Sequence, residues 1–166
     1  MTGSLADLFA QYHQSLVRML YRRTGDQDRA EEIAQEVFAR AVAAPPRNPR
    51  PWLFAVALNL VREEGRKSVR QGRRLMLYRA EQPEGVPSPD EEMIKEERIA
   101  QVRSALDTLN ERDREALLLK AEGFSYDEIA GTLGLAPGAI GTTLARARRR
   151  LVEAYRTGQE KRHVAS

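Results

Sequence analysis

Apolar side chains recur at steps of three and four residues along most of the chain, the spacing of helices that bury one face. A first stripe comprises Leu5, Leu8, Phe9, Tyr12, Leu16, Met19 and Leu20. After a break at Gly25 and Asp26, a second stripe comprises Ala30, Ile33, Ala34, Val37, Phe38 and Ala41. A third begins near Pro51 and comprises Leu53, Val56, Ala57 and Leu60. The sequence has no alternating strand pattern and no hairpin dipeptide, so it predicts an all-α fold.

Two proline-rich segments interrupt this pattern. Residues 45–51 hold four of the eight prolines, and proline fixes φ and removes a backbone donor, so a stiff connection is expected there. Residues 81–90 contain three prolines, one glycine and no apolar stripe, which is typical of a flexible linker. We therefore predict two small helical bundles, at residues 5–78 and 91–157, joined by a flexible acidic linker at residues 79–90.

The second bundle contains the pattern of a helix-turn-helix. A helix is expected to begin at Asp90, and the side chains expected to face the core are those of Ile99, Val102, Leu106 and Leu109. Asn110 is a good N-cap for the next helix, and Gly123 is a good residue to follow it. Ser125 and Glu128 form a capping-box pattern, and Gly134 ends that short helix. Pro137 opens another, whose inward stripe comprises Ile140, Leu144, Ala147 or Arg148, and Leu151. Such a second helix enters the major groove of DNA.

Charge is distributed unevenly along the chain. Residues 1–78 carry 13 basic and 8 acidic side chains, residues 79–100 carry 3 and 7, and residues 101–166 carry 11 and 9. The net charge of +3 therefore conceals two basic blocks separated by an acidic one. Four arginines fall within five positions at residues 146–150. This pattern is a weak pointer to nucleic acid as a partner.

Composition excludes several classes of protein. The absence of cysteine excludes a disulfide scaffold, a thiolate zinc site and a catalytic cysteine. The two histidines, His13 and His163, are far apart in sequence, so we expect no metal and no cofactor. No phosphate-binding loop or nucleophile elbow is present, so an enzyme and a small-molecule substrate are not expected. Without a signal sequence or an apolar run long enough to span a bilayer, we expect a cytoplasmic protein and not a membrane protein.

Four segments together resemble one family. Residues 30–38 resemble the region 2.2 signature of bacterial sigma factors and read AEEIAQEVF. Residues 52–60, WLFAVALNL, resemble the next helix in the extracytoplasmic-function (ECF) class. Residues 106–115 and 123–130, LDTLNERDRE and GFSYDEIA, resemble region 4 of that class. The chain is thus similar to an ECF RNA polymerase sigma factor over roughly residues 5–155, with a linker where the family has one.

This resemblance implies roles for particular residues. In the family, the region 2.2 helix docks on the β′ clamp helices of core RNA polymerase, and the β subunit is a further partner. The exposed side of that helix would comprise Asp28, Glu31, Glu32, Gln35 and Arg40. The next helix opens and reads the −10 element of promoter DNA, with contacts from Trp52, Asn59, Arg62, Arg66 and Lys67. Stacking on an aromatic ring and hydrogen bonding by an amide suit unpaired bases, while arginine suits phosphates.

The helix from Pro137 would read the −35 element. Its expected DNA contacts are Gly138, Thr142, Thr143, Arg146 and Arg149. Here the chain departs from the family, which often has Thr and a basic residue where this sequence has Ala139 and Gly141 around Ile140. The connection at residues 44–51 also lacks the aromatic residue found in the specificity loop of many members. The promoter sequence is therefore not predicted.

The expected function is that of an alternative sigma factor, which directs core polymerase to promoters, melts DNA and is not itself an enzyme. An anti-sigma protein is an expected partner, and such a partner can hold a sigma factor at the membrane. Two alternatives stay open. One is a freestanding helix-turn-helix regulator in which residues 1–78 sense a signal or dimerise. The other is a sigma-like decoy that titrates an anti-sigma protein.

Overall fold

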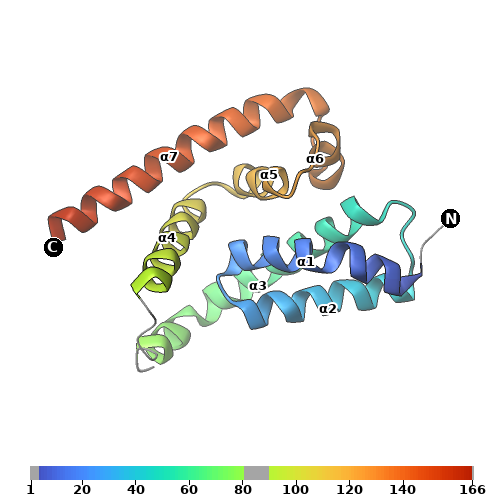
Figure 1. Cartoon of the computed structure of the whole chain (residues 1–166), viewed down its shortest axis with the longest axis horizontal. Coiled ribbons are helices and arrows are strands. Elements are labelled where there is room, and N and C mark those ends of the chain that lie inside the picture. The colour runs from blue at the N-terminus through green and yellow to red at the C-terminus, as the bar shows by residue number, and fades with distance from the viewer. Residues whose placement is uncertain (1–3, 81–89, 166) are drawn as a thin grey trace.

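A computed structural model describes the backbone of residues 4–80 and 90–165, and the side chains of residues 4–65, 91 and 94–164. The described residues form α-helices and one short 3-10 turn, with no strand among them. Figure 1 shows α1 to α3 side by side, with α4 to α7 lying along one side of them. The all-α prediction is confirmed. The predicted linker lies mostly at residues 81–89, outside the described residues.

The N-terminal bundle consists of α1 (Leu5–Thr24), α2 (Gln27–Ala43) and α3 (Pro49–Ala80). Ser4 and Asp7 form a capping box at the start of α1, and Gly25 ends that helix in the left-handed conformation at φ 73°. Asp26 then caps α2 by accepting a hydrogen bond from the backbone N–H of Arg29. The predicted inward stripe of α2 is buried at all of its positions, which are Ala30, Ile33, Ala34, Val37, Phe38 and Ala41.

The predicted stripes of α1 and α3 are partly wrong. Leu5 and Phe9 are each 44% exposed, although the Phe9 ring lies against Phe38 of α2 with centroids 5.1 Å apart, and full burial begins at Leu16 and Val17. On α3, the fully buried positions are Leu53, Phe54, Ala57, Leu58 and Val61, whereas the predicted Val56 and Leu60 are only partly buried. The inward face is rotated because α3 packs against α6 as well as against α1 and α2.

The C-terminal bundle consists of α4 (Asp90–Asp107), α5 (Glu111–Ala121), α6 (Tyr126–Leu133), a 3-10 turn (Pro137–Ala139) and α7 (Ile140–Ala165). Ile140, Leu144 and Ala147 of α7 are buried, so Ala147 and not Arg148 completes the inward stripe. On α4 the prediction for Val102 is wrong, because its side chain is 41% exposed. Helices α6 and α7, joined by the turn, form the predicted helix-turn-helix.

The capping box of α6 is present as predicted. The Ser125 hydroxyl accepts from the Glu128 N–H at 3.1 Å, and Glu128 Oε1 accepts from the Ser125 N–H at 3.0 Å. These hydrogen bonds hold the pKa of Glu128 below its ordinary value, with a contribution from nearby Arg50. Gly134 closes the helix in the left-handed conformation at φ 68°.

We expect Ser125→Ala to lower the free energy of unfolding by about 1 kcal/mol, because the cap satisfies a backbone donor that the helix leaves free. Urea denaturation followed by circular dichroism measures this change. Ser4→Ala, which removes the same cap from a helix whose N-terminal turn is exposed, is the matched comparison and should cost less. A Ser125→Ala protein as stable as the parent would contradict this role.

The two bundles share one continuous apolar core. Phe54 of α3 and Phe124, which lies between α5 and α6, meet edge to face with ring centroids 4.8 Å apart. Both are 0% exposed. The Arg50 guanidinium lies 4.1 Å from the centroid of the Phe124 ring. The bundles predicted as separate units therefore pack against each other in this structure, and whether each folds alone remains a prediction.

Candidate polymerase and promoter interfaces

The first candidate interface is the solvent face of α2. Its predicted members are all exposed, namely Asp28, Glu31, Glu32, Gln35 and Arg40. They lie opposite the fully buried stripe of the same helix, so the helix is amphipathic with an acidic outer side. The partners of these side chains are local to the helix: Glu31 accepts from Gln27 at 3.3 Å, Glu32 pairs with Arg29, and Arg40 pairs with Glu36 at 3.2 Å. Such a surface remains available to a charged partner.

The second candidate interface is one face of α3. Trp52 is half-buried and packs against the core, while Asn59 is exposed one turn before Arg62. The Arg62 Nη1 donates to the Asn59 Oδ1 at 2.7 Å, so the structure brings these two predicted residues together. The side chains of Arg66 and Lys67 lie outside the described residues, although both positions belong to α3.

Arg62 is bound by acids of the other bundle. Its Nε donates to Glu115 Oε1 of α5 at 2.8 Å, and its Nη2 donates to Glu115 Oε2 at 2.6 Å. Glu111 Oε1 lies 3.3 Å from the same Nε. The Glu115 side chain is 2% exposed, and this burial raises the pKa of Glu115 although Arg62 opposes the shift. In this arrangement Arg62 faces protein carboxylates.

The third candidate interface is the start of α7 with the preceding turn. Gly138, Thr142 and Arg149 are exposed, as a DNA-reading surface requires. Thr143 is only 4% exposed and its hydroxyl donates to the Ala139 carbonyl at 2.8 Å. Thr143 is therefore a core residue in this structure, and the predicted contact to DNA does not fit its position. The prediction for Thr143 was wrong because threonine is neither strongly apolar nor charged, so its residue type does not indicate whether it lies on the buried or the exposed side of a helix.

Arg146 has a structural partner that the sequence did not indicate. Its Nη2 donates to Asp113 Oδ1 at 2.7 Å, and Arg150 Nη1 donates to Asp113 Oδ2 at 3.2 Å. Asp113 is 0% exposed, and the hydrogen bond from Arg146 holds the pKa of Asp113 below its ordinary value. Arg146 therefore joins α7 to α5. A substitution of Arg146 would disturb this packing, so its effect on DNA binding could not be assigned to a lost DNA contact.

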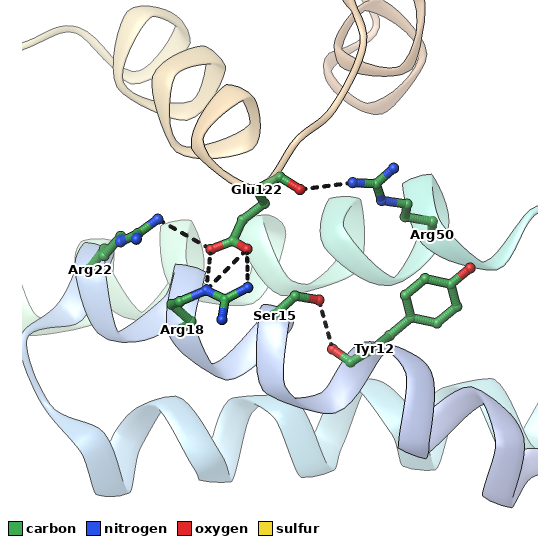
Figure 2. A network of polar contacts seen from close by, with 6 residues as sticks. All are labelled: Tyr12, Ser15, Arg18, Arg22, Arg50 and Glu122. Carbon is green, nitrogen blue, oxygen red and sulfur yellow. Dashed lines mark hydrogen bonds and ion pairs between the residues drawn. The ribbon is translucent and has the colours of Figure 1, made fainter.

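A group of polar contacts between the bundles was also missed by sequence reasoning (Figure 2). Arg18 and Arg22 of α1 bind the Glu122 carboxylate at 2.8 and 3.2 Å. Arg50 Nη2 donates to the Glu122 carbonyl at 2.8 Å, and its Nη1 donates to Glu128 at 3.0 Å. The Glu122 side chain is 1% exposed. Partners separated by about 70 to 100 positions leave no periodic signal in a sequence.

Comparison with known proteins decides the family. Residues 8–71 match Sigma-70 region 2, and residues 99–151 match Sigma-70, region 4. The chain is 34% identical over 157 residues to the ECF RNA polymerase sigma factor EcfG of Rhodopseudomonas palustris (strain TIE-1), covering 91% of this chain and 84% of the relative. The chain belongs to the ECF sigma factors. As such it is an alternative sigma factor, which binds core RNA polymerase and directs transcription initiation.

Other relatives agree. This sigma factor is 30% identical over 153 residues to the ferric citrate uptake sigma factor FecI of Escherichia coli (strain K12), covering 88% of each chain. A solved structure of the sigma factor RpoE in complex with the anti-sigma factor NepR, from Bartonella quintana, is similar at a TM-score of 0.63 and 26% identity. That match covers 91% of this sigma factor and 96% of RpoE. The resemblance predicted from the sequence is confirmed.

The described residues contain neither a membrane-spanning helix nor a cluster of metal ligands. No helix in them combines the length and apolarity needed to cross a lipid bilayer. Within the same residues, no three histidine, aspartate or glutamate side chains gather as metal ligands would. Sigma factors are not a class of enzymes.

Proposed function

We propose that the acidic outer face of α2 is the surface by which this sigma factor docks on the β′ clamp helices of core polymerase. The observation that carries this assignment is the buried apolar stripe of α2 with exposed polar side chains, from Asp28 to Arg40, on its opposite side. Acidic side chains of low burial favour rapid, oriented association with a basic partner. The β subunit is a second expected contact.

The face of α3 that carries Trp52, Asn59 and Arg62 is proposed to hold the −10 element. Opening a duplex without ATP requires unpaired bases to be bound better than paired ones. Trp52 supplies a partly accessible ring for stacking, Asn59 supplies an amide for a base edge, and Arg62 supplies a charge for phosphate. Arg66 and Lys67 follow on the same helix and are proposed to bind further phosphates of the DNA backbone.

The start of α7 is proposed to enter the major groove at the −35 element. Gly138 permits close approach of the backbone, and Arg149 offers a guanidinium about two turns after Thr142. Thr142 offers a methyl group and a hydroxyl oxygen that can accept, since its hydroxyl hydrogen is donated to the Ala139 carbonyl at 3.0 Å. Few side chains at this surface are suited to read base edges. Recognition is therefore expected to depend on backbone contacts and DNA shape as well as on bases.

Arg149→Ala should weaken binding to duplex DNA and reduce the slope of log affinity against log salt by about one, because one phosphate contact is lost. Fluorescence anisotropy with a duplex over a range of NaCl concentrations measures both quantities. Arg156→Ala, which removes an exposed arginine two turns further along α7, is the matched control and should leave the slope unchanged. An unchanged slope in Arg149→Ala would contradict a groove-facing surface here.

We also propose that an anti-sigma protein regulates this sigma factor. Its support is the likeness to RpoE, whose solved structure contains the anti-sigma factor NepR. Core polymerase and promoter DNA are in the cytoplasm, so we propose that this sigma factor is cytoplasmic. A membrane-anchored anti-sigma protein would retain the sigma factor at the inner surface of the membrane.

Gel filtration of the chain with core RNA polymerase tests the proposed docking. Co-elution with core polymerase is the expected result. A stable dimer that binds a palindromic operator and ignores core polymerase would instead indicate a freestanding regulator. Binding to an anti-sigma protein together with failure to bind core polymerase would indicate a decoy. The regulator hypothesis assigns residues 1–78 to sensing a signal or to dimerisation. Most of this segment, residues 8–71, matches Sigma-70 region 2, which favours the sigma factor.

A further inference from the structure

The arginines at positions 146, 148, 149 and 150 of α7 divide into two pairs with different surroundings. Arg148 and Arg149 are exposed, and neither has an ion pair within the part of the chain that the structure describes. Arg146 and Arg150 lie one turn apart, and both bind the Asp113 carboxylate of α5. Half of the arginine cluster is therefore engaged by a neighbouring helix of the same bundle.

Both oxygens of the Asp113 carboxylate accept hydrogen bonds. Arg146 Nη2 donates to Oδ1 at 2.7 Å and Arg146 Nε donates to Oδ2 at 3.2 Å, a paired geometry that fixes the plane of the guanidinium. Arg150 Nη1 donates to Oδ2 at 3.2 Å. The Asp113 side chain is 0% exposed, whereas those of Arg146 and Arg150 are 36% and 49% exposed. Because a buried carboxylate requires partners, these contacts belong to the folded C-terminal bundle.

The start of α5 fixes the position of Asp113. Asn110 caps the helix, and its Oδ1 accepts from the Asp113 N–H at 2.8 Å. Asp113 thus lies in the first turn of α5, where the helix dipole stabilises a negative charge. The hydrogen bond from Arg146 lowers the pKa of the Asp113 side chain, so this side chain is ionised at neutral pH. A fixed negative charge therefore faces Arg146 and Arg150.

Holding two arginines against α5 limits the binding of DNA that does not depend on sequence. Phosphates repeat along every duplex, so contacts with them carry no sequence information. A mobile arginine can follow phosphates in any register of α7 on the duplex, whereas an arginine fixed by paired hydrogen bonds cannot. This restraint matters for α7, because few side chains on its groove-facing side are suited to read base edges.

We propose that Asp113 is a positioning residue of the −35 interface, which holds Arg146 and Arg150 on α5 and away from the phosphates of non-cognate DNA. The proposal rests on the function assigned above to the start of α7. Arg149, about two turns after Thr142 on the same side of the helix, remains to contact phosphate. Specificity is a difference of affinities, so weaker binding to wrong sequences raises it.

Asp113→Asn separates this role from a merely structural one by the sign of its effect. Asparagine keeps the size of the side chain but lacks the charge, so Arg146 and Arg150 are released. We expect the affinity for a fluorescein-labelled, random-sequence duplex of about 30 base pairs in about 100 mM NaCl to rise by at least about threefold. The slope of log affinity against log salt should steepen by about one to two, because each new phosphate contact contributes about 0.9. A residue that only packs α7 would lower the affinity when replaced.

Two further variants identify the source of the gain. Combining Asp113→Asn with Arg146→Gln and Arg150→Gln removes the released side chains, so the gain should disappear. Glu160→Gln removes the same charge from an exposed position on the last turns of α7, and it should change the affinity by less than about twofold. Sequencing of duplexes bound from a library with about ten randomised base pairs measures discrimination, and preferred sequences should be enriched less by Asp113→Asn than by the parent.

The unaltered chain supplies a test that does not depend on how a variant folds. In nuclear magnetic resonance spectra, the Nε–H signal of Arg146, identified by its absence in Arg146→Lys, should keep its chemical shift when the random-sequence duplex is added. The Nε–H signal of Arg149 should move. An Arg146 signal that moves as far as that of Arg149 would overturn the proposal, because Asp113 would then not hold Arg146 away from DNA.

Three results with the variants would also overturn it. The first is an Asp113→Asn protein of normal helicity that binds the random-sequence duplex no more tightly than the parent and with the same salt slope. The second is a gain in affinity that persists in the triple variant, since loss of the negative charge alone would then explain it. The third is undiminished enrichment of preferred sequences by Asp113→Asn.

The function proposed for α7 fails in a different way. An unchanged salt slope in Arg149→Ala contradicts that function, and the role of Asp113 falls with it. If Arg149→Ala lowers the slope as expected while Asp113→Asn does not steepen it, only the role of Asp113 is overturned.

Discussion

Replacing Glu32 with lysine and Gln35 with alanine is expected to lower the affinity for core RNA polymerase by at least about tenfold. The two side chains are exposed on adjacent turns of α2, where the acidic face is proposed to meet the β′ clamp helices. Lysine reverses the negative charge of Glu32 on the face proposed for docking, and alanine removes an amide that can donate and accept. Neither side chain is part of the core, so helicity and thermal stability should change little.

Surface plasmon resonance with immobilised core polymerase measures this effect. Glu160→Lys changes the net charge by the same amount at an exposed position on the last turns of α7, and it is the matched control. It should retain affinity within about twofold, because the charge lies away from the docking face. If the double variant of α2 binds core polymerase as tightly as the control, the docking face is misassigned.

Leu144→Ala is expected to lower the free energy of unfolding by about 2 to 5 kcal/mol, the usual cost of a cavity at a fully buried leucine. Leu144 is 0% exposed and lies on the inward stripe of α7, between the buried Ile140 and Ala147. A domain of this size is stable by about 5 to 15 kcal/mol in total, so a large share of that stability would be lost. Binding to a −35 duplex should fall with it, because α7 loses its support.

Urea unfolding followed by circular dichroism checks this cost. Val152→Ala, on the same helix at a position 45% exposed, is the control and should cost less than about 1 kcal/mol. If both variants lowered the free energy of unfolding by the same small amount, Leu144 would not be buried in the core as it is in this structure.

Much of the fold was predictable because it depends on local patterns. The stripe of α2 was correct at each position, and the caps at Asn110, Ser125 and Gly134 were correct, since each follows from residues a few positions apart. The errors lie where distant segments meet. Phe54 and Leu58 are buried because α3 packs on a second bundle, which no pattern within α3 reveals.

The candidate sites divide in the same way. The exposed side of α2 follows from its buried side, so those residues could be named from the sequence. Asp113 could not, because a charged residue in a helix is usually solvated, and its partners Arg146 and Arg150 lie more than 30 positions away. The pairing of Arg62 with Glu115 was equally hidden. In this structure Arg62 is therefore engaged by a protein carboxylate, whereas the sequence suggested a side chain without a partner in the fold.

The central claim is that this chain confers promoter recognition on core RNA polymerase through its two bundles. In vitro transcription from a library of promoter fragments, with purified core polymerase and this chain alone, tests it most directly. We expect defined transcripts from a subset of fragments, and we expect them to disappear when Glu32→Lys and Gln35→Ala are combined. If core polymerase with this chain starts no more transcripts from the library than core polymerase alone, the account is contradicted.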